Sequence, residues 1–180
     1  MSTKEVRLGL VGIGNCAASL IHGIEYYRNL EFQTNHLSPQ GLIRDTIGEY
    51  KISSIKTVAA LDIATDKVGR DLSEAIKSPS ICIRNVSDIP YLNVPVHSGI
   101  LFDGIGESSS TVVEVCKDSW VATEEQRQRI SKYLIENKID VLVNFLPVGS
   151  KQATKFYAEI ALQSGSACVH AIPEPIGREP

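Results

Sequence analysis

Residues 6–17 read VRLGLVGIGNCA, and this stretch decides the fold. Its first part, residues 6–11, is a short apolar run that predicts a β-strand, and residues 15 to about 29 have the apolar spacing of a helix. Between the two lies a glycine turn, Gly12-Ile13-Gly14-Asn15-Cys16-Ala17. A turn of this pattern that directly follows a strand and opens a helix is typical of a dinucleotide-binding domain.

The residues of the turn have different expected roles. Gly12 permits a tight turn, and Gly14 lets a phosphate approach the backbone because no Cβ stands in the way. Ala17 is small enough for the helix to pack closely on the strand. The free N–H groups at the start of the helix would bind a pyrophosphate, helped by the positive end of the helix dipole. A purely structural strand–helix turn is the alternative that this motif alone leaves open.

A second strand is predicted over residues 55–62, and it ends in Asp62. A carboxylate there accepts hydrogen bonds from ribose hydroxyls and repels a 2′-phosphate, which favours NAD over NADP. The usual separation from the glycines is about 20 residues, and here an irregular excursion over residues 30–53 lengthens it. Asp62 as the N-cap of a following helix is the structural alternative, and Asp66 competes for that role.

The remaining pattern alternates strands with helices. A helix is expected over 66–77, strand-like pieces at 80–83 and 94–97, a helix at 123–137 opened by a Thr123/Gln126 capping box, a strand at 139–146, a helix capped by Ser150 and running to 163, and a strand at 167–172. Alternation of this kind predicts an α/β, Rossmann-like, doubly wound fold with a mostly parallel sheet and helices on both faces. We assign residues 1–172 to this NAD-binding domain and residues 173–180 to a linker or to the start of a further region.

Composition narrows the classes of function. A net charge of −3 over 180 residues gives no general attraction to nucleic acid or to anionic membranes. No secretory signal is visible, so the cytoplasm is the expected compartment. No C-x-x-C pair occurs, the histidines lack metal-ligand spacing, and no metal site is predicted. Free, buried thiols are expected at the four cysteines, Cys16, Cys82, Cys116 and Cys168.

Seven stretches, in order along nearly the whole chain, resemble the myo-inositol-3-phosphate synthases in their shorter, prokaryotic form. They are residues 11–17, 23–27, 58–62, 67–76, 103–106, 140–150 and 155–158. Gly-x-Gly-Asn-Cys-Ala at 12–17 and Leu-Pro-Val-Gly-Ser at 146–150 are much more specific than a generic nucleotide fold. The resemblance implies the N-terminal, NAD-binding half of such an enzyme.

By the resemblance, the activity is an NAD-dependent isomerisation of D-glucose 6-phosphate to inositol phosphate, a step of inositol and phospholipid biosynthesis. NAD would oxidise the sugar at C5, an enolate would close the ring, and NADH would return its hydride. The pyrophosphate would lie along the turn, at Gly12, Ile13, Gly14, Asn15, Cys16 and Ala17, and the ribose at Asp62. The family pattern adds Asn144, Phe145, Leu146, Ala171 and Ile172 as residues that face the cofactor.

Members of the family are considerably longer, and their lysine-rich catalytic and dimer-forming region follows the part that this chain matches. Lys151 and Lys155 lie on a predicted helix and are interpreted as surface charges, so no catalytic residue is assigned. Three interpretations stay open: the cofactor half of an inositol phosphate synthase, either truncated or completed by a second chain; a related oxidoreductase for another sugar phosphate; and a cofactor-binding module without chemistry of its own. The expected partners are further copies in a homo-oligomer or a chain that supplies the catalytic region.

Overall fold

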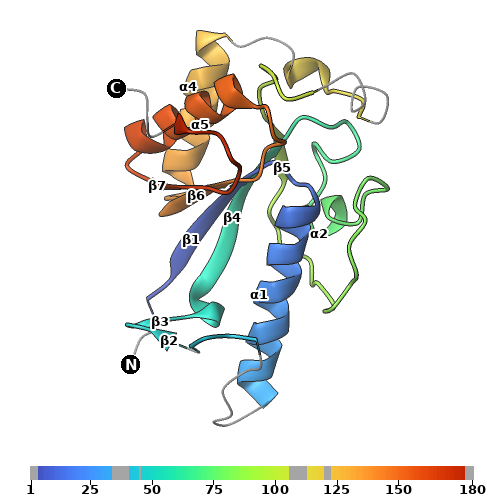
Figure 1. Ribbon diagram of the computed structural model, residues 1–180, viewed down its shortest axis with the longest axis vertical. Helices are drawn as coiled ribbons and strands as arrows, with labels where there is room; N and C mark the ends of the chain where they lie inside the picture. The colour runs from blue at the N-terminus through green and yellow to red at the C-terminus, as the bar shows by residue number, and fades with distance from the viewer. Residues whose placement is uncertain (1–3, 34–40, 45, 106–112, 120–122, 177–180) are drawn as a thin grey trace.

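The computed structural model describes residues 4–33, 41–44, 46–105, 113–119 and 123–176. Its strands are β1 (Val6–Val11), β2 (Thr46–Ile47), β3 (Tyr50–Lys51), β4 (Ile55–Asp62), β5 (Val96–Ser98), β6 (Val141–Asn144) and β7 (Ala167–His170). Its helices are α1 (Asn15–Gln33), α2 (Leu72–Ala75), α4 (Glu124–Glu136) and α5 (Lys151–Gln163), with 3₁₀ turns at Ile52–Ser54 and Lys117–Ser119 (Figure 1). None of the helices in these ranges is long and apolar enough to cross a membrane.

Five strands form one parallel sheet in the order β5-β4-β1-β6-β7. The first strand lies in the middle, with Leu10 beside Ala60 of β4 on one side and beside Val143 of β6 on the other. The chain therefore proceeds outward from β1 in one direction and then returns to build the other half. This reversal of strand order is the mark of a doubly wound nucleotide-binding sheet. The predicted fold class is confirmed.

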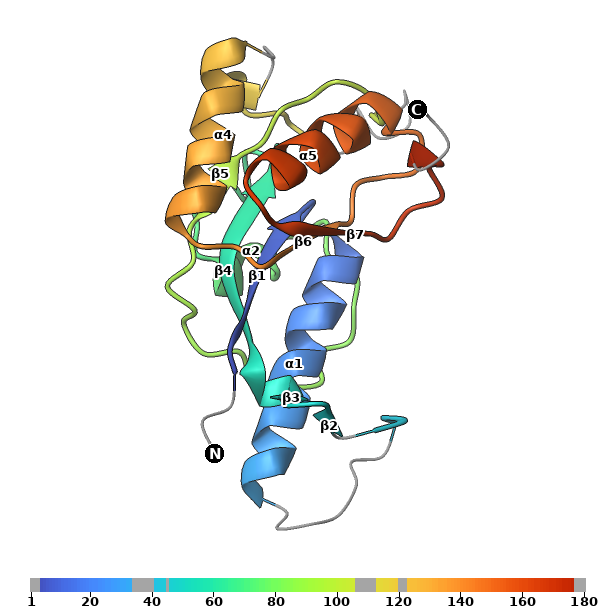
Figure 2. The same ribbon diagram turned by 90° about the vertical axis from the view of Figure 1, so that its left-hand side faces the viewer.

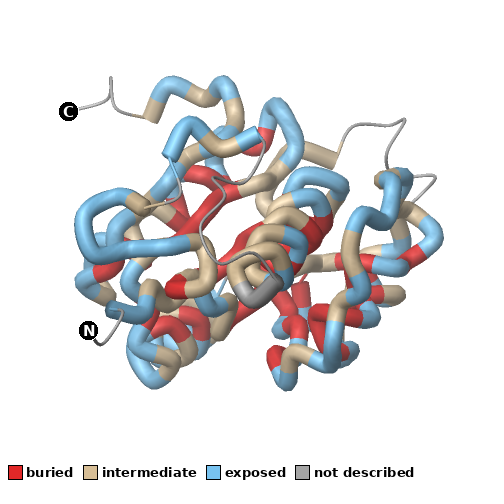
Figure 3. Tube along the Cα trace, turned by 90° about the horizontal axis from the view of Figure 1, so that it is seen from below, coloured by how far each residue is buried: buried red, intermediate tan, exposed pale blue. Residues whose placement is uncertain are grey.

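Helices cover both faces of the sheet, and each face has its own apolar core (Figures 1 and 2). On one face, α1 and α2 pack against Leu8, Leu10 and Ala60. On the other, α4 and α5 pack against Val11, Leu61 and Leu142. Successive side chains of a strand point to opposite faces, so strands covered on both sides need apolar residues at nearly every position. Figure 3 shows the resulting concentration of buried residues in the middle of the molecule.

The two predicted strands around the glycine turn, 6–11 and 55–62, have the bounds of β1 and β4. The helix predicted over 66–77 is wrong, because the helix is confined to α2, Leu72–Ala75. Gly69 has φ +85°, a conformation that a helix does not continue through. Asp71 then starts the helix anew, since its carboxylate accepts a hydrogen bond from Ser73 N at 2.9 Å.

The strand predicted at 80–83 is also absent, and the one at 94–97 forms at Val96–Ser98. The backbone N–H groups of residues 81 and 82 do not pair with another strand. Ile81 N donates to Ser78 O in a local turn, and Cys82 N donates to the side-chain oxygen Oδ1 of Asn15. The excursion 30–53 contains the end of α1 and a small antiparallel hairpin, β2–β3. Residues 34–40, 45 and 106–112, together with 177–180 of the predicted linker, lie outside the described residues.

Candidate functional site

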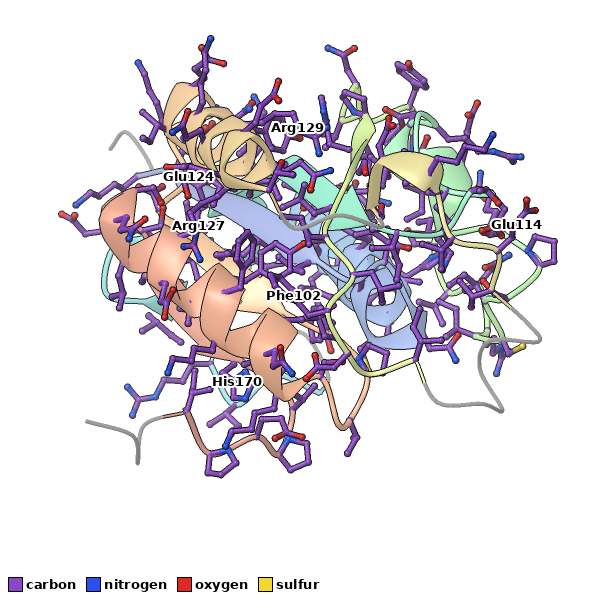
Figure 4. All side chains as sticks on the ribbon, turned by 90° about the horizontal axis from the view of Figure 1, so that it is seen from above. Phe102, Glu114, Glu124, Arg127, Arg129 and His170 are labelled. Atoms are coloured by element: carbon purple, nitrogen blue, oxygen red, sulfur yellow. The ribbon has the colours of Figure 1, made fainter. Side chains whose placement is uncertain are left out.

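A cavity of about 220 Å³ opens at the carboxyl edge of the sheet. Its walls come from the ends of β1 and β4, from residues 100–105 after β5, and from the loop between β6 and α5. The connections that follow the neighbouring strands β1 and β6 go to opposite faces of the sheet there. The crevice between two such connections is where open parallel sheets bind ligands. Figure 4 views this edge, with Phe102 pointing toward α5, where its ring centroid lies 5.1 Å from that of Phe156.

The glycine turn forms one wall of the cavity. Gly12 has φ +82°, and a Cβ there would lie 2.9 Å from the carbonyl oxygen of Phe145. A Cβ at Gly14, in contrast, would meet no protein atom within 4 Å, and Gly14 lines the cavity. The first glycine is therefore required by the protein itself. The second leaves open the space that a ligand phosphate would need, which fits a bound dinucleotide.

The other predicted pyrophosphate residues divide into core and surface. Ile13 and Ala17 are fully buried against the sheet, so they shape the turn by packing. Cys16 is exposed at the start of α1. Asn15 binds the loop opposite, accepting from Cys82 N at 2.8 Å. The first four N–H groups of any helix lack a partner in the helix itself, and at α1 they begin beside Gly14.

Asp62 is held rigidly at the end of β4. Its Oδ2 accepts from Ile13 N at 2.6 Å, which joins it to the glycine turn, and its Oδ1 accepts from Ile63 N at 2.8 Å and Ala64 N at 2.9 Å. It lines the cavity, and no helix starts there, so Asp62 is not a helix N-cap. Asp66 is not one either, because the N-cap of the next helix, α2, is Asp71; the Asp66 carboxylate instead accepts from the Ser78 hydroxyl at 2.9 Å.

The end of β6 supplies two of its three predicted residues to the cavity, Phe145 and Leu146. The buried Asn144 is used internally: its Nδ2 donates to Thr154 Oγ1 at 3.0 Å and its Oδ1 accepts from Leu146 N at 2.9 Å. Asn144 Nδ2 also lies 3.2 Å from His170 Nδ1, whose side chain is labelled beside α5 in Figure 4. Asn144 thus does not line the cavity but holds the loop between β6 and α5 in place through these hydrogen bonds.

Two further predicted residues follow β7. Ala171 is exposed and Ile172 is half-buried, and neither lines the cavity formed by the described residues. Ala171 N donates to Asn144 O at 3.1 Å, which continues the pairing of the two strand ends. Their assignment to the cofactor stays a prediction.

Asp103, Gly104 and Ser150 form a further wall of the cavity, and the sequence predicts none of them as a cofactor-binding residue. Asp103 caps α5 in place of Ser150: its carboxylate accepts from Gln152 N at 2.7 Å and from Ala153 N at 3.1 Å. Ser150 occupies the N-cap position, but its side chain makes no capping hydrogen bond, so the predicted capping by its hydroxyl is wrong. Gly104, with φ +85°, packs so closely on Ser150 that a Cβ would overlap its side chain. The sequence signal that could have pointed to this wall is the family resemblance of the motifs at 103–106 and 146–150.

Tyr157 of α5 also lines the cavity, and its hydroxyl accepts from Ile100 N at 2.9 Å. Burial raises the pKa of Tyr157 to about 12, so the phenol keeps its proton at neutral pH.

Nowhere in the described ranges do three or more His, Cys, Asp or Glu residues gather as metal ligands. All four cysteines are free thiols, but the expectation that they are buried is wrong: Cys16 and Cys82 are exposed, and Cys116 and Cys168 are half-buried.

The parallel sheet, the glycine turn and the carboxylate at the next strand end define a Rossmann-like α/β domain. No family model matches the chain. It is 37% identical over all 180 residues to the inositol-3-phosphate synthase of Corynebacterium glutamicum, of which it covers 47%. It is 39% identical over 176 residues, or 98% of the chain, to that of Mycolicibacterium smegmatis, of which it covers 46%.

Two solved structures have a similar fold. The crystal structure of Ari2 superposes with a TM-score of 0.81 at 27% identity, over 98% of this chain and 48% of that one. A myo-inositol-1-phosphate synthase-related protein from Thermotoga maritima gives 0.68 at 20% identity, over 96% and 49%, a likeness of fold. The chain is thus a relative of the inositol-3-phosphate synthases, as the sequence predicted. It spans about half the length of the curated relatives that it matches.

Proposed function

We propose that this chain is the NAD-binding part of an inositol-3-phosphate synthase. The observation that carries the proposal is the open space over Gly14, next to a carboxylate fixed at the neighbouring strand end. A turn with only a structural role needs the first glycine and the packing of Ala17, but it has no need for an uncovered second glycine at a cavity.

The residues of the chain would bind different parts of the cofactor. N–H groups at the start of α1 would donate to the pyrophosphate, and the Asp62 carboxylate would accept from ribose hydroxyls. Phe145 and Leu146 would cover the cofactor from the opposite wall and keep water away from it. When bound, NAD supplies a reversible acceptor of hydride for a sugar alcohol.

The chemistry of the sugar would need further groups. Lys67 is the only lysine or arginine among the described residues that line the cavity. Developing negative charge on a substrate oxygen is best stabilised by several fixed donors or cations. We therefore assign cofactor binding to this chain and the stabilisation of substrate charge to a region outside it. The single cationic group is also what favours the second candidate, a cofactor-binding module without chemistry of its own.

Calorimetric titration of the purified chain with NAD tests the proposal. We expect Gly14→Val to abolish binding, because its side chain would fill the space left for the pyrophosphate. Gly23→Val is the matched control, since a Cβ at Gly23 of α1 also meets no atom within 4 Å but lies away from the cavity. Equal binding by wild type and Gly14→Val would contradict the site, and equal affinity for NAD and NADP would contradict the role of Asp62.

A further inference from the structure

Lys67 is a buried lysine at the wall of the cavity. The residue is 6% exposed, whereas lysines are almost never buried unless they are paired. A tight turn after β4 brings it back to the end of that strand: Lys67 N donates to Ala64 O at 3.1 Å, and Val68 N donates to the same oxygen at 2.9 Å.

The turn that carries Lys67 is fastened to a second segment. Thr65 N donates to Glu114 O at 2.9 Å, and Cys116 N donates to Ile63 O at 2.7 Å. One backbone hydrogen bond on each side of Ala64 thus fixes the end of β4 and the start of the turn that carries the lysine. Its position is set by the fold, as a binding group requires.

The ammonium group is only loosely paired. Lys67 Nζ lies 3.9 Å from Asp62 Oδ2, beyond hydrogen-bond distance, and it donates no hydrogen bond to any described residue. Asp62 already accepts three backbone hydrogen bonds. An ammonium has three donors, and a buried cation is costly unless oxygens satisfy them. Lys67 therefore has donors to give to an oxygen that enters the cavity.

We propose that Lys67 and Asp62 together hold a vicinal diol, the ribose diol beside the glycine turn; this rests on the proposed binding of NAD. One hydroxyl donates to Asp62 Oδ2, and the neighbouring oxygen accepts from Lys67 Nζ. A carboxylate only accepts and an ammonium only donates, whereas a hydroxyl does both, so the pair matches two adjacent hydroxyls. The diol thereby gives the buried ammonium its missing acceptor.

The charges of the pair favour a neutral ligand over a phosphate. Lys67 and Asp62 sum to zero, so a 2′-phosphate would gain one cation while facing one fixed carboxylate. Lys67 accordingly strengthens the binding of NAD without turning the site into one for NADP. If Lys67 served only to neutralise Asp62, its removal would change stability but not the dependence of binding on the two hydroxyls.

Calorimetry with NAD and with its 2′-deoxy and 3′-deoxy adenosine analogues tests the proposal. For the wild-type chain, each analogue should bind about 10-fold more weakly than NAD, as expected for the loss of a hydrogen bond to a charged group. Lys67→Met should bind NAD about 10-fold more weakly and become indifferent to one of the two deoxy changes. Lys77→Met, an exposed lysine of the following segment, should behave as wild type.

Three outcomes would overturn the inference: NAD affinity of Lys67→Met within 2-fold of wild type, full sensitivity of that variant to both analogues, or a wild-type chain that ignores either hydroxyl. Thermal melts followed by circular dichroism establish that each variant is folded. If Lys67→Met does not fold, the titrations of Lys67→Gln and of the wild-type chain decide whether the inference holds. Failure of the wild-type chain to bind NAD would contradict the proposed function as well. A wild-type chain that ignores a hydroxyl would also contradict the ribose contact given to Asp62, whereas the two outcomes for Lys67→Met contradict only the role of Lys67.

Discussion

At the turn between β1 and α1, Gly12 is held by both neighbouring strands. Its N–H donates to Leu61 O at 2.9 Å, and Phe145 N donates to Val11 O at 2.8 Å. The sequence predicted the tight turn, because the spacing of the glycines is local. It could not show that the backbone of Phe145 closes over Gly12, since that approach depends on how β6 pairs with β1.

Replacing Gly12 by Ala should destabilise the fold as well as the site. The new Cβ would lie 2.9 Å from Phe145 O, in a backbone conformation that side chains rarely adopt. We expect a loss of about 1–3 kcal/mol in the free energy of unfolding, measured by urea denaturation. Gly23→Ala in α1 should be neutral or stabilising by up to about 1 kcal/mol. An unchanged midpoint for Gly12→Ala would show that the turn can relax.

Asp62 and Asn144 show how far residue-level prediction extended at the site. Both were expected at the carboxyl ends of strands, and both are there. The pattern could not reveal that Asn144 is consumed by Thr154 and Leu146, because these partners are set by the loop that leads into α5. The sequence predicts residues 66–77 as one regular helix, and such a helix gives Lys67 no place at the cavity; the turn that puts it there is set by contacts with residues 114–116.

Among the elements, long apolar strands were predictable and the segment from 66 to 98 was not. Strands β1 and β4 are defined by their own composition. Between α2 and β5, in contrast, backbone N–H groups bind side chains that are distant in the chain: Leu92 N and Val94 N donate to Asp71, at 3.2 and 2.7 Å. No local periodicity encodes such partners, so the pattern failed where tertiary contacts replace regular pairing.

Asp71 should link the stability of this region to pH. Burial alone would raise the pKa of Asp71, but hydrogen bonds from Ser73, Val94 and Leu92 outweigh it and hold the pKa below its usual value of 3.8. A carboxyl whose pKa is lowered by folding stabilises the fold above its unfolded pKa, and this stabilisation is lost as the pH falls through the lower, folded pKa. Thermal melts should therefore show acid destabilisation that begins below about pH 4.

Substitution of Asp71 separates its charge from its hydrogen bonds. Asp71→Ala leaves buried N–H groups unpaired and should cost about 2–3 kcal/mol at neutral pH. Asp71→Asn keeps one acceptor oxygen, so it should cost less and should also reduce the acid dependence. Urea titrations at pH 7 and pH 3.5 give both quantities. An acid dependence equal to that of wild type in Asp71→Asn would assign it to other carboxylates.

The hairpin β2–β3 lies at the end of the molecule where β1 begins, opposite the cavity (Figure 2). Ile43 is fully exposed and Ile47 is 73% exposed, beside a hollow that Leu42 and Tyr50 also line. We predict that this surface contributes to stability or to association between subunits and not to cofactor binding. A shortened hairpin, or Ile43→Glu with Ile47→Glu, should leave NAD affinity within a few-fold of wild type.

Sedimentation velocity and thermal melts of those hairpin variants, alongside the wild-type chain, measure association and stability. A change in either, with NAD binding retained, is the expected result. Loss of NAD binding by a variant that is still folded would contradict the separation of the two regions.

On the scale of the whole molecule, the sheet places its binding groups on one edge, and the chain matches about half the length of its relatives. The class of fold and the position of the cavity followed from the order of strands and helices, since a reversal of strand order puts a crevice at one predictable place. The sequence could not supply the loop contacts of Asp103 and Ser150, which depend on packing between segments about 50 residues apart.

We predict that the purified chain binds NAD but does not convert glucose 6-phosphate to inositol phosphate. Enolisation and ring closure develop negative charge on oxygen, and the described cavity residues offer one lysine, already beside Asp62, to receive it. The corresponding downstream half of a related synthase, fused or added in trans, should restore turnover. An assay of inositol phosphate formation, with Gly14→Val in the fused form as the negative control, measures this. Turnover by the isolated chain at a rate typical of enzymes, on the order of 1–10³ s⁻¹, would place the catalytic groups within these 180 residues.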